Sequence, residues 1–80
     1  MGIERDRGIQ RVPFTEAVFW LVMTDINEMM VVDLNEFIDD SMLQSASNSI
    51  NTQRFIMGKP PIYLSLARNG TQIQAYPMEQ

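Results

Sequence analysis

The sequence feature that most constrains the fold is the segment 62–77, IYLSLARNGTQIQAYP, which has the pattern of a β-hairpin. Asn69-Gly70 at its centre is the preferred pair for a type I′ turn, because both central residues of that turn need positive φ angles. A loop this short fixes the register of the flanking strands, 62–67 and 71–76. The hairpin therefore predicts antiparallel pairing in the C-terminal part of the chain.

The two faces of this hairpin are predicted to differ, because side chains alternate between the faces of a strand. One face is apolar and should close a hydrophobic core; the other is polar, with two tyrosines as cross-strand neighbours. The apolar face holds Ile62, Leu64, Leu66, Ile73 and Ala75, and the polar face holds Tyr63, Ser65, Gln72, Gln74 and Tyr76.

The composition bounds the class of protein. A chain of 80 residues with 45% hydrophobic and 20% charged residues is apolar enough to fold as one small domain. It contains no cysteine and no histidine, which excludes disulfides and thiolate metal sites and removes the commonest general base and metal ligand. We therefore expect no enzymatic activity, no metal site and no cofactor.

The apolar segment before the middle of the chain permits two interpretations. In the first, residues 17–24 and 28–33 are two strands, as their β-branched and aromatic content favours, with the polar break TDINE between them. In the second, residues 14–32 form one buried helix after Pro13. We favour the strands, because the polar break falls where a hairpin connection belongs.

A helix is predicted next, over about residues 34–47. Asp33 has the position of an N-cap with Glu36 three residues later, an arrangement that resembles a capping box. Apolar residues at helical spacing follow from Leu34 onward, and the run SASNSINT weakens the helix toward its end. The segment 54–57 fits either a short strand or a last helical turn.

These elements predict an α+β fold of the order ββαββ, with one amphipathic helix packed on an antiparallel sheet. Residues 13–80 form the single domain, and residues 1–12 are either a loose arm or an edge strand. The longest apolar run, AVFWLVM, is far shorter than the ~20 residues of a membrane span, so we expect a soluble, cytoplasmic protein.

Charge is distributed unevenly along the chain, whose net charge is −4. All seven charged residues between 12 and 53 are acidic, and the arginines and the lysine lie on either side of that segment. The acids of the predicted helix, with an apolar residue among them, suggest a surface that binds another protein. These candidate partner-binding residues are Asp33, Glu36, Asp39, Asp40 and Leu43.

An alternative site of a different class uses the basic ends of the chain. Exposed aromatic side chains beside arginines can stack and neutralise single-stranded nucleic acid. The residues of this alternative are Arg5, Arg7, Arg11, Tyr63, Arg68 and Tyr76.

Together these observations favour a non-enzymatic protein-interaction module that also self-associates as a homodimer. Its small size and acidic composition would suit an accessory protein of a phage or mobile element that binds a host factor. Direct nucleic-acid binding is the alternative hypothesis, in the role of a regulatory protein.

Overall fold

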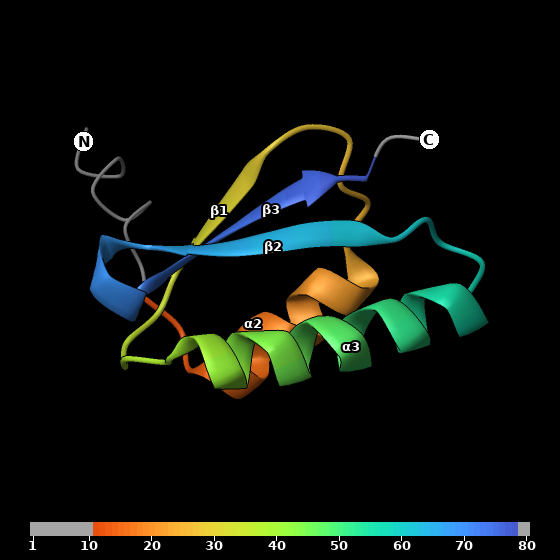
Figure 1. Ribbon diagram of the computed structural model, residues 1–80. Helices are drawn as coiled ribbons and strands as arrows, with labels where there is room; N and C mark the ends of the chain where they lie inside the picture. The colour runs from red at the N-terminus through yellow and green to blue at the C-terminus, as the bar shows by residue number, and fades with distance from the viewer. Residues whose placement is uncertain (1–10, 79–80) are drawn as a thin grey trace.

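A computed structural model describes residues 11–78 as a small α+β domain. Its three strands form one antiparallel sheet in the order β1-β3-β2, and both helices cover the same face of that sheet (Figure 1). The predicted fold class, an α+β domain with an antiparallel sheet and a C-terminal hairpin, is confirmed. The elements in chain order are α2 (Phe14–Met23), β1 (Met30–Asp33), α3 (Asp40–Ile56), β2 (Ile62–Ala67), the short 3₁₀ turn η1 (Arg68–Gly70) and β3 (Gln72–Pro77).

The hairpin formed by β2 and β3 has the predicted register, with Tyr63 opposite Tyr76. Asn69 and Gly70 both have positive φ angles, 55° and 88°, and the Thr71 amide donates a 3.1 Å hydrogen bond to the Arg68 carbonyl. This is the hydrogen bond that closes a type I′ turn. The last paired residues are Ala67 and Gln72, so the turn lies within a four-residue connection.

The first predicted strand, residues 17–24, is wrong, because residues 14–23 form helix α2. Ala17, Leu21 and Val22 are buried on one side of this helix, at the spacing of a helical stripe. The β-branched and aromatic content favoured a strand, but packing against α3 and the sheet decides the conformation. The alternative interpretation was right about a helix from residue 14, but the helix ends at Met23 and β1 follows at Met30.

Helix α2 begins directly after Pro13 and is capped from a distant part of the chain. The Pro13 carbonyl accepts from the amides of Glu16 and Ala17, both at 3.0 Å. The Phe14 amide, which has no partner within the helix, donates to Glu36 Oε2 at 2.8 Å. A sequence pattern confined to residues near Pro13 could not reveal this cap, because Glu36 lies in the segment before α3.

Helix α3 begins later and ends later than predicted, at Asp40 and Ile56 instead of 34 and 47. Its N-cap is Asp39 rather than Asp33: Asp39 Oδ1 accepts from the Met42 amide at 2.9 Å. The serine- and asparagine-rich run is helical throughout. Its Asn51 side chain bonds the backbone of Ile62, so that it does not compete with the helix for its own amides.

A glycine ends α3. Gly58 has φ +79°, its amide donates to the Phe55 carbonyl, and the Lys59 amide donates to the Arg54 carbonyl at 2.7 Å. This pair of hydrogen bonds is a Schellman motif, which satisfies carbonyls left free at a helix end. The segment 54–57 is therefore the last turn of α3 and its C-cap, not a strand.

The segment between β1 and α3 is fixed to the tip of the hairpin. The Leu34 amide donates to the Thr71 carbonyl and the Ile38 amide donates to the Gly70 carbonyl, both at 2.9 Å. A Cβ on Gly70 would lie 2.5 Å from the Ile38 carbonyl oxygen. Glycine is thus required here both by its φ angle and by the close approach of a second backbone.

Replacing Gly70 by alanine should destabilise the fold more than the same change at Gly58. Both glycines have positive φ, which costs roughly 1–2 kcal/mol for a residue with a Cβ. A Cβ at Gly58 meets nothing within 4 Å, whereas one at Gly70 displaces the Ile38 backbone. Urea unfolding of Gly70→Ala and Gly58→Ala measures the difference; equal losses of stability would show that the Ile38 contact is not significant.

Residues 11 and 12 lead into α2 along the edge of the sheet. Val12 forms a parallel bridge with Leu34, its amide donating to the Asp33 carbonyl and its carbonyl accepting from Asn35, both at 3.0 Å. The interpretation of residues 1–12 as an arm or an edge strand lies otherwise outside the described residues.

The core lies between the sheet and the two helices, and one charged residue is part of it. Arg54 is completely buried, with 0% of its surface exposed. The apolar side chains of the core are Ala17, Leu21, Val22, Ile26, Val32, Leu34, Ile38, Leu43, Ala46, Ile50, Ile62, Ile73 and Ala75.

The Arg54 guanidinium is held by backbone carbonyls. Nη1 donates to the carbonyls of Leu21 at 2.7 Å and Thr24 at 2.9 Å, with Val22 at 3.5 Å, and Nε donates to the Pro60 carbonyl at 2.8 Å. Carbonyls at the end of a helix lack partners and carry partial negative charge, so they suit a cation. Arg54 therefore joins the ends of α2 and α3 to the start of β2.

Arg54→Met should destabilise the domain severely, by roughly 3–5 kcal/mol, because several buried carbonyls lose their donor while most of the side-chain volume is kept. Thermal or urea unfolding followed by the fluorescence of Trp20 measures the change. The matched control is Gln53→Ala, at the exposed neighbouring position, which should shift stability by at most about 0.5 kcal/mol. A similar small shift for Arg54→Met would contradict the role of the guanidinium.

Candidate functional site

The predicted acidic face does not form one uniform surface. Asp33 is half-buried on β1 and accepts from Gln72 Nε2 at 2.9 Å. Glu36 caps α2 and Asp39 caps α3, as described above. Asp40 is exposed in the first turn of α3. Three of the four carboxylates therefore hold the fold together in addition to any role in binding.

The prediction that Leu43 is exposed among these acids is wrong. Leu43 is 8% exposed and belongs to the core. Because α3 begins at Asp40 instead of Leu34, Leu43 lies on the buried stripe that continues through Ala46 and Ile50. The candidate partner-binding set thus keeps its acids but loses its apolar contact.

The residues of the alternative nucleic-acid site are placed apart. Tyr63 and Tyr76 are neighbours on the uncovered face of the sheet, with ring centroids 6.5 Å apart and planes tilted by 55°. Tyr76 also donates from its hydroxyl to Gln74 Oε1 at 2.8 Å. Arg68 lies in the hairpin loop, five residues along from Tyr63, which is roughly 17 Å in an extended strand.

Arg11 lies at the hairpin-loop end of the sheet. It precedes Val12, which is bridged to Leu34, and Leu34 bonds Thr71 in the loop that follows Arg68. Arg5 and Arg7 lie outside the described residues. The structure therefore brings Arg11 and Arg68 toward one end of the sheet and the tyrosines toward the other.

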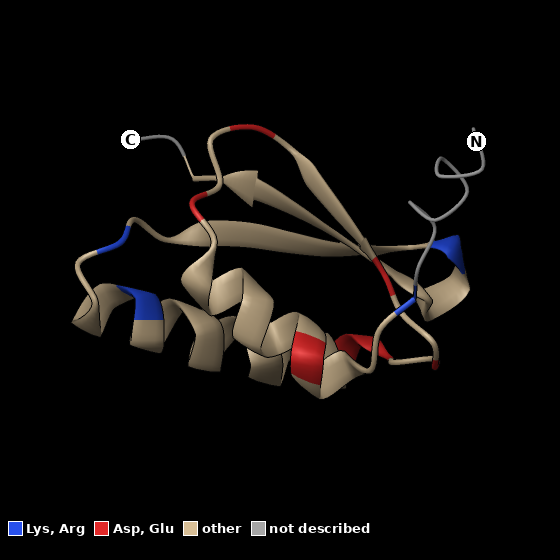
Figure 2. Ribbon diagram, turned by 180° about the vertical axis from the view of Figure 1, so that it is seen from behind, with Lys and Arg blue, Asp and Glu red and all other residues tan. Residues whose placement is uncertain are grey.

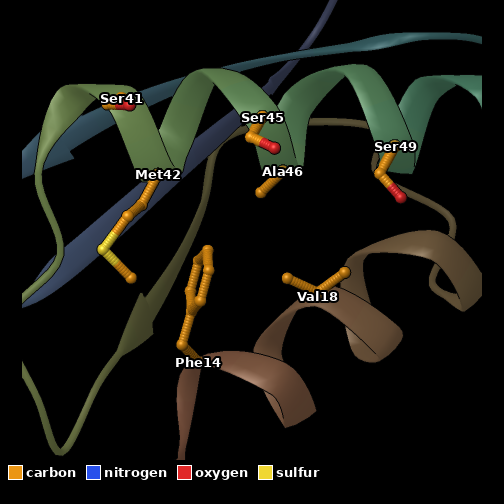
Figure 3. A pocket seen from close by; sticks show the side chains of 7 residues that line it. All are labelled: Phe14, Val18, Ser41, Met42, Ser45, Ala46 and Ser49. Carbon is orange, nitrogen blue, oxygen red and sulfur yellow. The ribbon is translucent and has the colours of Figure 1, made fainter.

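A groove lies between the two helices, beside the first turn of α3. It has a volume of about 430 Å³ and is lined by apolar side chains and serine hydroxyls (Figure 3). Phe14 and Val18 point from α2 toward α3, and Met42 points back from α3 across the gap. The lining residues are Phe14, Val18, Ser41, Met42, Ser45, Ala46 and Ser49.

The two helices run in the same direction, so both of their N-terminal ends border this groove. Phe14 and Val18 of α2 line it together with Ser41 and Met42 of α3, whereas the C-terminal ends are joined by Arg54. Acidic segments of both helices lie at the end where the helices begin (Figure 2). Glu16 and Asp40 are the exposed acids in the first turns of α2 and α3.

The outward side of α2 carries a surface that the sequence analysis missed. Only Thr15 and Glu16 of its ten residues are polar, and both lie in the first turn, so the exposed side of the helix is apolar beyond that turn. Phe19 is 64% exposed, Trp20 49% and Met23 47%. The strand interpretation concealed this surface, because it placed the same side chains alternately inside and outside a sheet. The helical spacing of Phe19 and Met23 is the signal that could have found it.

One ion pair lies outside these surfaces and is exposed to solvent. Lys59 Nζ donates to Asp25 Oδ1 at 2.9 Å. The hydrogen bond and the charge of Lys59 together lower the pKa of Asp25 below its ordinary value of 3.8. Burial lowers the pKa of Arg54, partly offset by the negative charge of Asp25.

The pKa of Asp25 should rise toward its ordinary value in Lys59→Met. A carboxylate whose folded-state pKa is lowered stabilises the fold at neutral pH, and this contribution disappears as pH falls through the folded-state pKa. Carboxyl NMR titration of the wild type and the variant measures the shift, with Lys59→Arg as the control that keeps the charge. An unchanged Asp25 titration in Lys59→Met would contradict the pairing.

Residues 11–78 contain no group of three or more acidic or histidine side chains able to hold a metal ion. No helix in this part of the chain combines the length and the apolar character that crossing a membrane requires. The chain matches no known protein family, and no curated protein and no solved structure is detectably similar to it.

Proposed function

We propose that the chain is a non-enzymatic protein-interaction module whose contact surface is the outer side of α2 and the groove between α2 and α3. The observation that carries this proposal is the apolar outward side of α2. With about half of each ring or side chain exposed, Phe19, Trp20 and Met23 present roughly 300 Å² of apolar surface. A patch of this size is comparable to the largest apolar patch on an ordinary monomer, and such patches often have a function.

The partner in this proposal is an amphipathic helix with basic residues at one end. The groove offers apolar walls and serine hydroxyls, and none of its seven lining side chains is ionisable. Such a surface provides contact area rather than an acid or a base for catalysis. Glu16 and Asp40, exposed where the two helices begin, would attract the basic end of the bound segment.

The predicted acidic residues thus form the charged border of an apolar surface in this proposal. Mutation of Asp39 would remove the cap of α3 as well, so Asp40 and Glu16 are the better residues to test. The accessory role for a phage or mobile element, inside the host cell, belongs to the same proposal and is supported by size and composition alone. Direct nucleic-acid binding is the weaker proposal, because Tyr63 and Arg68 lie at opposite ends of β2.

Selection of a displayed library of amphipathic helical peptides on the immobilised domain tests the proposal. We expect the selected peptides to carry an apolar stripe with lysine or arginine at one end. Their affinity should fall by ~10-fold or more for Phe19→Gln/Met23→Gln, since each buried side chain contributes about 1–3 kcal/mol. It should fall less, and with a dependence on salt, for Glu16→Lys/Asp40→Lys.

Tyr63→Gln on the uncovered face of the sheet is the matched control and should leave the affinity unchanged. Peptides that bind the α2 variant as well as the wild type, or that lose affinity for Tyr63→Gln, would contradict the proposed surface. Binding to DNA or RNA that falls steeply with salt would instead support the nucleic-acid alternative.

A further inference from the structure

Strand β2 is an edge strand of the sheet that residues 11–78 form. It pairs with β3 on one side, and no strand of the described chain pairs with its other side (Figure 1). Alternate residues of a strand direct their amide and carbonyl groups to opposite sides of the strand. Which residues of β2 direct these groups outward is fixed by two observations at its start.

The first observation is that Ile62 lies opposite Pro77, which has no amide to donate to β2. The second is that Asn51 of α3 bonds both backbone groups of Ile62: Nδ2 donates to its carbonyl and Oδ1 accepts from its amide, each at 2.9 Å. Ile62 therefore directs its backbone away from β3. By alternation, the backbone amides and carbonyls of Leu64 and Leu66 also point away from β3. No strand in residues 11–78 forms hydrogen bonds with these groups.

The partial burial of the Leu64 and Leu66 side chains is consistent with an unpaired edge at β2. They lie on the same face of β2 as Ile62 and pack against the core, yet they remain only partly buried, whereas Ile62 is buried. The core is thus incompletely closed along this side. Phe55, one helical turn after Asn51 on the same flank of α3, is 81% exposed.

This edge lacks the features that keep free strands apart. Natural edge strands are usually protected by charged residues, proline or a bulge. β2 contains no charged residue and no proline, and its six residues pair with β3 without interruption. At the other edge of the sheet, the Asp33 carbonyl already accepts from the Val12 amide.

We propose that the open edge of β2 binds β2 of a second copy of the chain, in antiparallel orientation about a two-fold axis at Ser65. In this register Leu64 lies opposite Leu66 of the second copy, and each such pair exchanges two backbone hydrogen bonds. The order Leu-Ser-Leu is symmetric about Ser65, so the edge is complementary to itself. The two sheets become one continuous sheet.

The Asn51 contact disfavours one of the two neighbouring registers. Pairing Leu64 with Leu64 of the second copy would place Ile62 opposite Leu66, and the backbone of Ile62 is already bonded to Asn51. The Ser65 register leaves that contact intact. It also adds apolar contacts between the leucines on the core side and places no like charges across the axis.

Single-cysteine variants test both the dimer and its register, because the chain has no cysteine of its own. Across the axis the two Ser65 residues form a non-hydrogen-bonded pair, with Cα atoms about 4.5 Å apart, which a disulfide can bridge. Under mild oxidation Ser65→Cys should form a covalent dimer. Tyr63→Cys and Ala67→Cys should each form no covalent dimer alone but should cross-link when mixed, since the register places them opposite each other.

Gln74→Cys is the matched control. It neighbours Ser65 on the same face but lies on the central strand, where two copies would be roughly 14 Å apart, and it should not cross-link. Cross-linking of Gln74→Cys as efficient as that of Ser65→Cys, or no cross-linking of Ser65→Cys, would overturn the proposal.

Sedimentation equilibrium with charge variants tests the same contact without oxidation. The wild type should be a dimer, Ser65→Lys and Ser65→Glu should each be monomers, and an equimolar mixture of the two should form a heterodimer. The heterodimer shows that the single variants are folded. The proposed β2 contact would be overturned if the wild type stayed monomeric at millimolar concentration. It would also be overturned if the dimer persisted in Ser65→Lys but dissociated in Phe19→Gln/Met23→Gln.

This inference is independent of the proposed function, since it concerns a different surface and a different partner. Loss of the dimer in Ser65→Lys with peptide binding intact would leave the proposed function standing. The reverse result, peptide binding lost in the α2 variant with the dimer intact, would leave the β2 contact standing.

Discussion

The buried guanidinium of Arg54 is the interaction on which the arrangement of the chain depends. It comes from the last turn of α3, reaches the final carbonyls of α2 and bonds Pro60 just before β2. A buried cation is tolerated only if its donors are satisfied, and here the acceptors are backbone carbonyls rather than a carboxylate. Since those carbonyls belong to the end of α2 and to the segment before β2, a single side chain of α3 fixes the parallel course of the helices and the entry of the chain into the sheet.

The parts of the fold that could be predicted are those determined by residues close to one another in the sequence. Asn69-Gly70 and the alternation on either side of it define the hairpin and its register, and both could be predicted because turn chemistry acts over a few residues. The fold class followed from the same elements. The strand predicted over residues 28–33 is also present, as β1 at Met30–Asp33, because it is a short apolar run beside a polar break.

The parts that could not be predicted depend on contacts between distant segments. Helix α2 is capped by Glu36, and α3 is held to the hairpin through Ile38, so local patterns misplaced both helices. The same error affected the candidate site. Because α3 begins at Asp40 and not at Leu34, Leu43 lies in the core and not on the predicted surface. No pattern marks Arg54 as buried, since backbone carbonyls leave no signature in a sequence.

The surfaces that remain uncovered follow from the size of the domain. Two helices can cover one face of a three-stranded sheet, but nothing in residues 11–78 covers the outer side of α2, the uncovered face of the sheet or the edge at β2. A small domain buries a smaller fraction of its surface than a large domain does, so apolar residues beyond the core stay at the surface. In this domain two groups of them lie on α2 and at the end of α3, and others, such as Phe37 and Tyr63, lie elsewhere along the chain.

The close contact between Gly70 and Ile38 also decides where the chain can be interrupted. A hairpin loop is normally the first choice for inserting a peptide tag, an attached fluorophore or new chain termini, because such tips are free in most proteins. Here the tip is packed against another segment, and an insertion would separate two backbones that bond each other. The exposed connection at Asn27 to Met29, which leads from α2 into β1, is the better place for such engineering.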